Sequence, residues 1–334
     1  MSIYTFFLAV GSSMGGIING WVAQKLSLQW FWWLCAIGAG VNLLAAIFLL
    51  PETNYNRNHL MDSSDGLHPI GNSVYPAGSN VHNPPKGGMT LWSILKFHSP
   101  SQPVKNIFKI FLRPFPFIAV PAVFWACIIY GNLLAWVVAG DIQKSVFFPQ
   151  PPYLLSLGET GSTSVASILG IACGALAGGF VSDKIAQRAT RRNNGIREPE
   201  QRLPALLPAA LASPIGCIIF GVTFANNTSW IGPCFGLFFN NFALACGPNV
   251  ALTYVVDGYL PWAGEAMVTV NAFKELVAFG MSYGTVPWLL KVGWLHMWGA
   301  ACGISAALLL TSIPMYIWGK AFRRMTAEWR FVKV

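Results

Sequence analysis

Eight apolar stretches of about twenty residues, separated by polar residues, limit how this chain can fold. They lie at roughly 3–24, 30–50, 117–138, 162–182, 205–225, 231–256, 266–288 and 295–318. Each is long enough to cross about 30 Å of hydrocarbon as a helix that rises 1.5 Å per residue. Segments of about ten alternating residues, which a transmembrane barrel needs, do not occur. The blocks predict an all-α, polytopic helical membrane protein with about eight transmembrane helices.

The charged residues support the same fold class. They make up 10% of the 334 residues, whereas hydrophobic residues make up 54%. A soluble domain carries roughly 25% charged residues, so an ordinary water-soluble enzyme is excluded. The net charge of +9 does not indicate nucleic acid as a partner, because the basic residues lie between and after the apolar blocks, where membrane topology places them.

The distribution of Lys and Arg among the connections predicts the orientation of the chain. The connections after the second and fourth blocks and the segment after the eighth hold seventeen of these residues, whereas the alternate connections hold only Lys25, Lys144 and Lys291. Basic residues favour the cytoplasmic side of a membrane. We therefore expect both termini in the cytoplasm. No address signal is readable, and we expect the plasma membrane rather than the vacuole.

The blocks and connections divide the chain into four segments. Two transmembrane helices lie in 1–50, a cytoplasmic linker in 51–116, six transmembrane helices in 117–318, and a basic cytoplasmic tail in 319–334. The linker begins rich in Pro, Gly, Asn and Ser, which is typical of a disordered tether. Over 89–116 apolar and basic residues interleave. This pattern fits either an amphipathic juxtamembrane helix on anionic inner-leaflet lipids or an ordinary lead-in to the third block.

Two motifs point to a family. The second block ends in a P-E-T-x-Y-x-R signature at 51–57, and the fourth block runs into G-F-V-S-D-K-I-A-Q-R at 179–188. The second motif resembles the G-x-x-x-D-[RK]-x-G-[RK]-[RK] loop of the major facilitator superfamily, with Ala186 where the family usually has Gly. The first is similar to the signature that closes the sixth span in fungal members of the drug:proton-antiporter-like branch.

The resemblance implies a major-facilitator fold that lacks its first four spans. Members of the family have twelve spans in two six-helix halves. The first two blocks would then correspond to the fifth and sixth spans, and the other six to a complete C-terminal half. The chain has no hydrophilic tail before its first block, which favours a gene model that starts late. A genuinely shortened protein is the alternative.

The loop after the fourth block provides candidates for gating, namely Gly179, Asp183, Lys184 and Arg188. An acid and several bases beside a helix end can hold neighbouring helices together through ion pairs and charge–dipole contacts. Breaking and remaking such contacts would shift a transporter between inward and outward conformations. The alternative is a basic loop that only sets the topology.

Glycines recur at helical spacing in two blocks. The fourth block contains a G-x-x-x-G-x-x-x-G pattern, and the first is similarly rich in glycine; the residues are Gly170, Gly174, Gly178, Gly11, Gly15, Gly16 and Gly20. Small residues at these spacings let helix backbones approach closely, so we expect close helix packing. The first block lies where the antiporter branch has a glycine-and-proline motif, but the proline is absent, so an antiporter mechanism receives little support.

Charges inside the blocks indicate where a solute could bind, because a charge in lipid is expensive. Lys274 and Glu275 are such a pair in the seventh block, and their side chains point about 100° apart on a helix. They could serve a solute or a gate, or they could tie helices together near the membrane surface. Glu275 is also the one deeply placed carboxylate that could couple a proton.

Further candidates for a central cavity are polar or aromatic residues of the third, sixth and seventh blocks. They are Tyr130, Asn132, Trp136, Asn240, Asn241 and Asn271. Each could contact a solute, and each could equally form a hydrogen bond between helices. Asn271 and Lys274 are three residues apart and share a helix face.

Asn226 and Asn227 begin two overlapping N-x-[ST] tripeptides in the connection between the fifth and sixth blocks. In the predicted orientation this connection faces outward, so both are candidates for glycosylation. The alternative is chance occurrence of a short pattern close to the membrane.

Signals of catalysis, metals and cofactors are absent from the sequence. Four of the five histidines lie in the linker, and no H-x-x-x-H or phosphate-binding G-x-x-x-x-G-K-[ST] pattern occurs. The pattern G-x-S-x-G occurs at 11–15 and 280–284, but both matches lie inside apolar blocks and not on the strand-to-helix turn that a hydrolase nucleophile requires, so they do not indicate catalysis. All seven cysteines lie inside apolar blocks, where we expect buried small side chains and no disulfide framework. We expect neither an enzyme nor a bound metal or cofactor.

These observations favour secondary active transport of a small organic solute by alternating access, with proton coupling as one option. The alternative is a truncated, non-transporting membrane remnant or an assembly partner. The expected partners are a small-molecule solute and the lipid bilayer, without nucleic acid. The identity of the solute, the coupling ion and the oligomeric state stay open.

Overall fold

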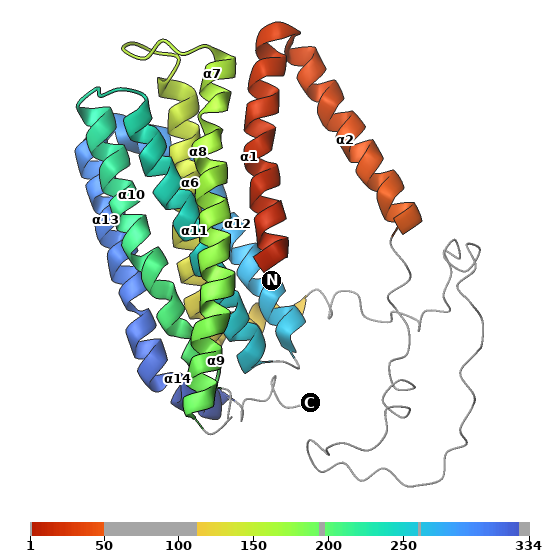
Figure 1. Cartoon of the computed structure of the whole chain (residues 1–334), viewed down its shortest axis with the longest axis vertical. Helices are drawn as coiled ribbons and strands as arrows, with labels where there is room; N and C mark the ends of the chain where they lie inside the picture. Colours follow the sequence, from red (N-terminus) through yellow and green to blue (C-terminus); the bar gives the residue numbers. More distant parts are fainter. Residues whose placement is uncertain (1, 50–111, 194–197, 260–261, 327–334) are drawn as a thin grey trace. The chain divides into compact units, whose positions relative to one another are not determined.

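The computed structural model describes residues 2–49, 112–193, 198–259 and 262–326, all of them helices or short connections (Figure 1). No strand occurs among these residues, which confirms the all-α fold. The elements are α1 (Ser2–Lys25), α2 (Leu28–Leu49), the 3-10 helix η1 (Phe115–Ala119), α6 (Pro121–Phe147), α7 (Leu157–Ser162), α8 (Ser164–Leu176), the π-helix η2 (Ala177–Val181), α9 (Ser182–Arg192), the 3-10 helix η3 (Pro199–Leu206), α10 (Leu207–Ala225), α11 (Ile231–Gly258), α12 (Ala263–Val292), α13 (Trp294–Leu310) and α14 (Ser312–Thr326).

Every predicted block falls on a helix, but several helices are longer than their apolar blocks. The third block was expected to end near residue 138, whereas α6 continues to Phe147. This extension holds Asp141 and Lys144, which pair one turn apart at 2.8 Å and so support the helix beyond its apolar part. The fourth block becomes the continuous run α7–α8–η2–α9.

Within the part of the chain that the structure describes, six helices or runs of helices are long and apolar enough to cross a bilayer. They are Gln29–Ile47, Pro121–Phe147, Leu157–Arg192, Pro199–Ala225, Ile231–Gly258 and Trp294–Thr326. The other two long helices are α1 with 24 residues and α12 with 30, and their length alone would suffice for a span. Lys274 and Glu275 near the middle of α12 lower its hydropathy.

Several expectations lie outside the described residues. These are the P-E-T-x-Y-x-R signature at 51–57, the linker up to residue 111 with most of its amphipathic segment, and the end of the basic tail from residue 327. Two compact units divide the chain. The first comprises Met1–Phe31 with Ile107–Val334, and the second comprises Trp32–Asn106, of which only part of α2 is described.

Within the first unit, α8 packs between α1 and α11, and α6 packs on α12 and α11. Helix α10 lies between α11 and α13. Two apolar cores fill the spaces between these helices. One joins α6, η3, α10 and α11 around Leu133, Val250 and Tyr254. The other joins α6, α10 and α13 around Phe220 and Trp298.

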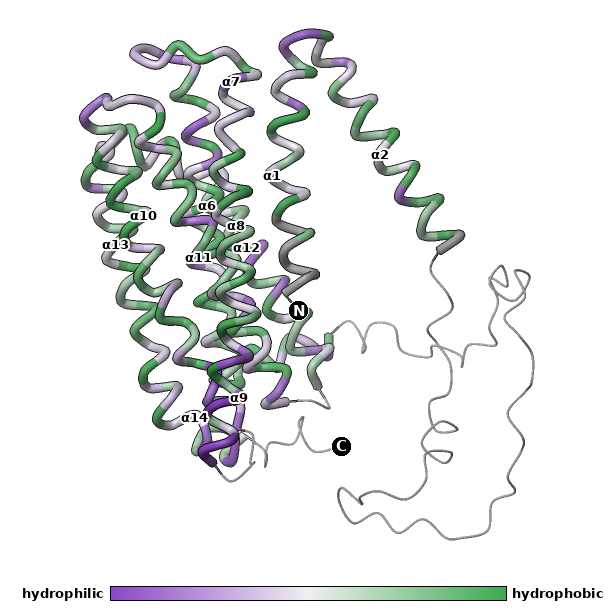
Figure 2. Tube along the Cα trace, in the orientation of Figure 1, coloured by the Kyte–Doolittle hydropathy of each residue, from purple (hydrophilic) through white to green (hydrophobic). Residues whose placement is uncertain are grey.

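The unit has two ends with different composition. We call the end that holds α7 and the last turns of α1 and α6 the α7 end, and the end that holds α9, η3 and α14 the α9 end (Figure 1). Figure 2 shows that hydrophilic residues gather in α9 and α14. The last turns of these two helices contribute four basic residues, namely Arg191, Arg192, Arg323 and Arg324.

The glycine pattern of the fourth block packs directly on α11. A Cβ atom added at Gly170 or Gly174 would collide with backbone oxygen atoms of α11, and one at Gly178 would lie 2.8 Å from the Cα atom of Cys246. The prediction of close helix packing is therefore confirmed for this stripe.

The glycines of the first block differ among themselves. A Cβ at Gly20 would lie 2.7 Å from the backbone oxygen of Leu157, and one at Gly16 would lie 3.2 Å from Oγ of Ser164. In contrast, no neighbouring atom within the described part of the chain lies within 4 Å of such a Cβ at Gly11. At Gly15 the nearest atom is 4.0 Å away and belongs to Asn19 of the same helix. Close packing is therefore confirmed for Gly16 and Gly20 and is wrong for Gly11 and Gly15.

Candidate functional site

Lys274 of α12 is buried against α6. Only 7% of this residue is exposed, and its Nζ donates a hydrogen bond of 3.0 Å to Oη of Tyr130. The same Nζ lies 4.5 Å from the centre of the Tyr130 ring, where the negative face of the ring attracts a cation. A charged lysine is thus held between two helices of the apolar unit.

Glu275 is the second charge of this group. Its Oε1 lies 3.5 Å from Nζ of Lys274, and its side chain is 68% exposed. The two neighbours in sequence therefore face different surroundings. Lys274 points toward α6, while the Glu275 carboxylate is accessible and only loosely paired. We call Lys274, Tyr130 and Glu275 the Lys274 group.

Asn132 and Trp136 form a different group, which links α6 to α13. The Nε1 of Trp136 donates to Oδ1 of Asn132 at 2.9 Å, and the Nδ2 of Asn132 donates to Oγ of Ser305 at 3.3 Å. All three residues are buried. Both predicted residues thus form the hydrogen bonds between and within helices that were the alternative to solute contact.

The three other predicted asparagines are not brought together with Lys274 by hydrogen bonds. Asn241 and Asn271 each donate to the carbonyl four residues earlier in their own helices. The Oδ1 of Asn240 accepts a contact of 3.5 Å from Sγ of Cys217, whereas its buried Nδ2 has no hydrogen-bond partner among the described residues.

Asp183 lies in the first turn of α9 and pairs with η3. Its Oδ1 accepts a hydrogen bond of 2.9 Å from Nη1 of Arg202, and Nε of the same arginine lies 3.0 Å from Oδ2 of Asp257. Arg202 is 9% exposed and thus holds two carboxylates from two other elements. The arrangement ties α9 and the end of α11 to η3.

The other gating candidates lie in η2 and α9. Gly179 is buried in η2, and Arg188 is exposed. The Nζ of Lys184 lies 4.1 Å from the centre of the Phe180 ring. Ala186, which replaces the glycine usual in the family motif, is buried at 4% exposure.

Sequence reasoning missed the charged residues that face α14. Glu200 of η3 is 6% exposed and accepts two hydrogen bonds of 2.9 Å from Arg323. Beside it, Lys320 donates to Glu198 at 2.6 Å, and this hydrogen bond lowers the pKa of the Glu198 carboxyl. The basic residues of α14 were counted only for topology, because partners more than 120 residues away have no signal in sequence spacing.

Asn226 and Asn227 lie in the turn between α10 and α11 and are both accessible. Asn227 has a positive φ of 49°, which asparagine tolerates better than most residues. The neighbouring Thr228 hydroxyl donates to the Thr223 carbonyl.

The described residues contain no group of three or more His, Cys, Asp or Glu side chains that could hold a metal ion. All seven cysteines are free thiols. Four of them are buried as expected, Cys302 is partly buried, and Cys35 and Cys173 are exposed. For the last two the expectation of burial is wrong, because they lie on helix faces that no described residue covers.

Comparison with known proteins gives consistent results. The family described as Major Facilitator Superfamily matches residues 1–281. An uncharacterized MFS-type transporter of Schizosaccharomyces pombe is 24% identical over 371 residues, which cover 98% of this chain and 63% of that protein. Protein HOL1 of Saccharomyces cerevisiae is also 24% identical, with 98% of this chain and 66% of that protein covered.

Among other similar proteins, the Efflux pump FUBT of Fusarium oxysporum is 25% identical over 325 residues, which cover 94% of this chain and 50% of that protein. The chain thus spans less than two thirds of the length of these relatives. No solved structure matches it.

Proposed function

The chain belongs to the major facilitator superfamily, and from this premise we propose that it takes part in secondary active transport of a small organic solute by alternating access. It is an integral, multi-pass membrane protein, and its relatives include proteins named as efflux pumps. These names favour outward transport. The chain spans 63% of the length of its S. pombe relative, and the proposal is that the helices of this chain carry out the transport by themselves.

The observation that carries the proposal is the burial of Lys274. A charged side chain in a membrane helix is costly and is retained where it serves a solute, an ion or a conformational change. The hydrogen bond to Tyr130 orients the ammonium, and the loose, accessible carboxylate of Glu275 leaves room for an incoming group. Lys274 and Tyr130 bind the solute in this proposal, and Glu275 exchanges the coupling proton.

The two ends of the unit have separate roles in this scheme. The basic residues of α9 and α14 support a cytoplasmic location of the α9 end and of both termini. There, the ion pairs of Arg202 with Asp183 and Asp257 hold α9, η3 and α11 together, and their rearrangement accompanies opening toward the cytoplasm. The expected membrane is the plasma membrane.

Three sequence-based proposals concern the surroundings of this unit. The segment 89–116 binds anionic lipids of the inner leaflet, since apolar and basic residues alternate along it. The chain is organised as two transmembrane helices in 1–50, a cytoplasmic linker in 51–116, six transmembrane helices in 117–318 and a basic cytoplasmic tail in 319–334. Asn226 or Asn227 carries a glycan, which the exposure of both residues supports.

A second candidate function follows from the length of the chain relative to its relatives. A unit with one half of a solute site could act without transporting, as an assembly partner of another membrane protein. Transport and this alternative make different predictions for the purified chain.

Proteoliposomes that contain the purified chain and a trapped pH-sensitive dye distinguish the two functions. Citrate and chloramphenicol serve as probes of an anionic solute, which the Lys274 ammonium would attract, and of an uncharged drug-like solute. If the chain transports, one of them should drive proton movement, and Lys274→Met should reduce the initial rate at least tenfold. Lys291→Met is the matched control, because Lys291 is an exposed lysine of the same helix and its loss should leave the rate unchanged.

Folded, monodisperse protein that moves protons with neither probe would contradict transport by this chain and would favour the assembly partner. Equal effects of the two lysine substitutions would contradict the role of Lys274.

A further inference from the structure

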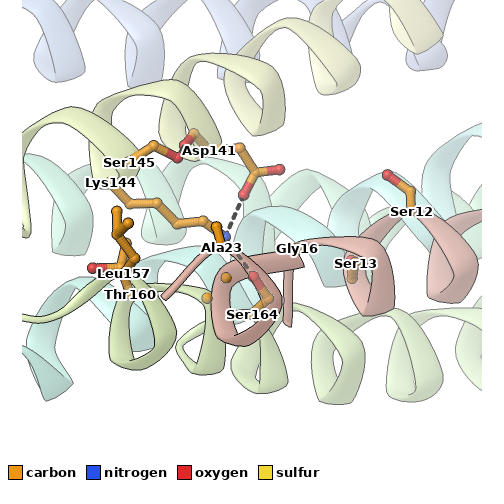
Figure 3. A pocket seen from close by; sticks show the side chains of 12 residues that line it. Ser12, Ser13, Gly16, Ala23, Asp141, Lys144, Ser145, Leu157, Thr160 and Ser164 are labelled. Carbon is orange, nitrogen blue, oxygen red and sulfur yellow. Dashed lines mark hydrogen bonds and ion pairs between the residues drawn. The ribbon is translucent and has the colours of Figure 1, made fainter. Parts of the chain in front are cut away.

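A polar pocket of about 350 Å³ lies at the α7 end, lined by residues of α1, α6, α7 and α8. Figure 3 shows Lys144 of α6 reaching between Asp141 of the same helix and Ser164 of α8. Asp141 follows Tyr130 by eleven residues on α6. The two residues therefore lie on nearly the same face of the helix but about 16 Å apart along its axis. The pocket is therefore separate from the Lys274 group.

The charges of this pocket cancel within it. The Nζ of Lys144 lies 2.8 Å from Oδ1 of Asp141 and donates a hydrogen bond of 2.9 Å to Oγ of Ser164. Only 7% of the lysine is exposed. The Asp141 side chain is 46% exposed, so its carboxylate can still accept hydrogen bonds from the pocket. An ammonium has three N–H groups, and these two contacts leave one donor of Lys144 for a ligand.

A second observation points to a ligand. Thr160 of α7 lines the pocket and is 7% exposed, yet its Oγ1 has no hydrogen-bond partner among the described residues. A buried hydroxyl without a partner costs free energy, and such groups are usually satisfied by water or a bound molecule. Ser12 and Ser13 of α1 add two hydroxyl groups to the same wall.

The chemistry of the lining selects the ligand class. An ion of either sign would have to displace a short ion pair or stay unpaired, and both cost free energy. A hydroxyl group both donates and accepts, so it can donate to the Asp141 carboxylate, accept from Lys144, and do either with Thr160. A molecule with several hydroxyl groups therefore fits all three positions without net charge.

We propose that the pocket between α1, α6, α7 and α8 is a second binding site, which takes a small uncharged polyhydroxy solute. The site goes beyond the proposed function, since its occupancy depends neither on Lys274 nor on a completed transport cycle. Its test is accordingly a binding measurement, and its failure would leave the transport proposal untouched.

The experiment measures protection of a thiol in the pocket. Ser12→Cys places a cysteine on the pocket wall, and Gln150→Cys, in the exposed turn after α6 and outside the pocket lining, provides the reference position. The full chain is treated with a small hydrophilic methanethiosulfonate, and mass spectrometry follows both positions. Sorbitol should slow modification of the cysteine at position 12 at least threefold and leave modification at position 150 unchanged.

Variants and charged analogues complete the test. Thr160→Val keeps the side-chain shape and should abolish the protection, as should Lys144→Met, whereas Ser282→Ala on α12 should retain it. Equal modification rates with and without sorbitol in folded protein would overturn the proposal. Protection by glucosamine or gluconate but not by sorbitol would overturn the ligand class, and protection that survives Thr160→Val would overturn the site.

Discussion

The two ends of the helical unit are held together by different forces. At the α7 end, α1 meets α7 through backbone contacts, with Gly20 against the carbonyl of Leu157 and Gly161 against the carbonyl of Gly16. At the α9 end, ion pairs join four elements, and Arg202 and Arg323 each hold carboxylates from other parts of the chain.

The difference predicts different sensitivities. Close backbone packing acts over short distances and fails when volume is added. Ion pairs tolerate changes of volume but fail when one partner is removed or screened by salt. The α7 end should therefore respond to side-chain size and the α9 end to charge.

The largest effect is expected from Arg323→Met. Without this arginine, the carboxylate of Glu200 stays buried without its partner, which should cost about 3 kcal/mol. Thermal unfolding followed by gel filtration in detergent measures the loss. The double variant Glu200→Gln with Arg323→Met should recover most of the stability, and a double variant as unstable as the single one would show that charge compensation is not the cause.

Added volume at the α7 end should come next. Gly20→Leu forces α1 away from α7, because even a Cβ would lie 2.7 Å from the Leu157 carbonyl. A cost of about 2 kcal/mol is typical of such overpacking, and hydrogen exchange of α7 should rise. Gly11→Leu is the control, since no neighbouring atom of the described chain lies within 4 Å there. Similar hydrogen exchange of α7 in both variants would contradict the claim that the α7 end is sensitive to side-chain size.

Salt should change hydrogen exchange at the α9 end but not at the α7 end, with a smaller effect than either substitution. Raising the NaCl concentration from 50 mM to 500 mM shortens the screening length severalfold. Exchange in η3 and α14 should increase about twofold, because Asp183 and Lys320 are partly exposed, while exchange in α7 stays constant. A uniform increase over both ends would indicate general loosening.

The smallest effect is expected from Lys320→Gln. The pair with Glu198 is accessible, so its loss should cost less than about 1 kcal/mol. Because Lys320 lowers the pKa of Glu198, the pair stabilises the fold above the usual pKa of a glutamate and loses this contribution as the pH falls through the lowered pKa. The free energies of unfolding of wild type and variant should therefore differ at pH 7 and become equal in acid. A difference in unfolding free energy that persists in acid would exclude this cause.

The sequence predicted the helices well, because apolar periodicity and length are local properties. Close packing at Gly170 and Gly174 was also predictable, since their spacing alone places them on one helix face. The burial of Lys144 was not predictable. It follows an apolar block and resembles a loop lysine, and only the contacts with Asp141 and Ser164 extend α6 and bury the charge.

The candidate site was predictable in composition but not in grouping. Lys274 and Glu275 were recognised as a pair, yet the partner Tyr130 is 144 residues away. Asn132 and Trp136 were grouped with them, although they face α13. Which side chains of one helix meet which neighbour depends on tertiary packing, and one sequence carries no such pairing signal.

The contact between Glu200 and Arg323 also has a consequence for biosynthesis. Ribosomes insert the chain from its N-terminus, so Glu200 enters the membrane region before Arg323 has been made. During that interval, 123 residues long, the carboxylate must stay in water or contact a temporary partner. The α9 end can reach its final form only once α14 has emerged, so synthesis that stops within α13 would leave the Glu200 carboxylate without the arginine that pairs with it in the folded protein.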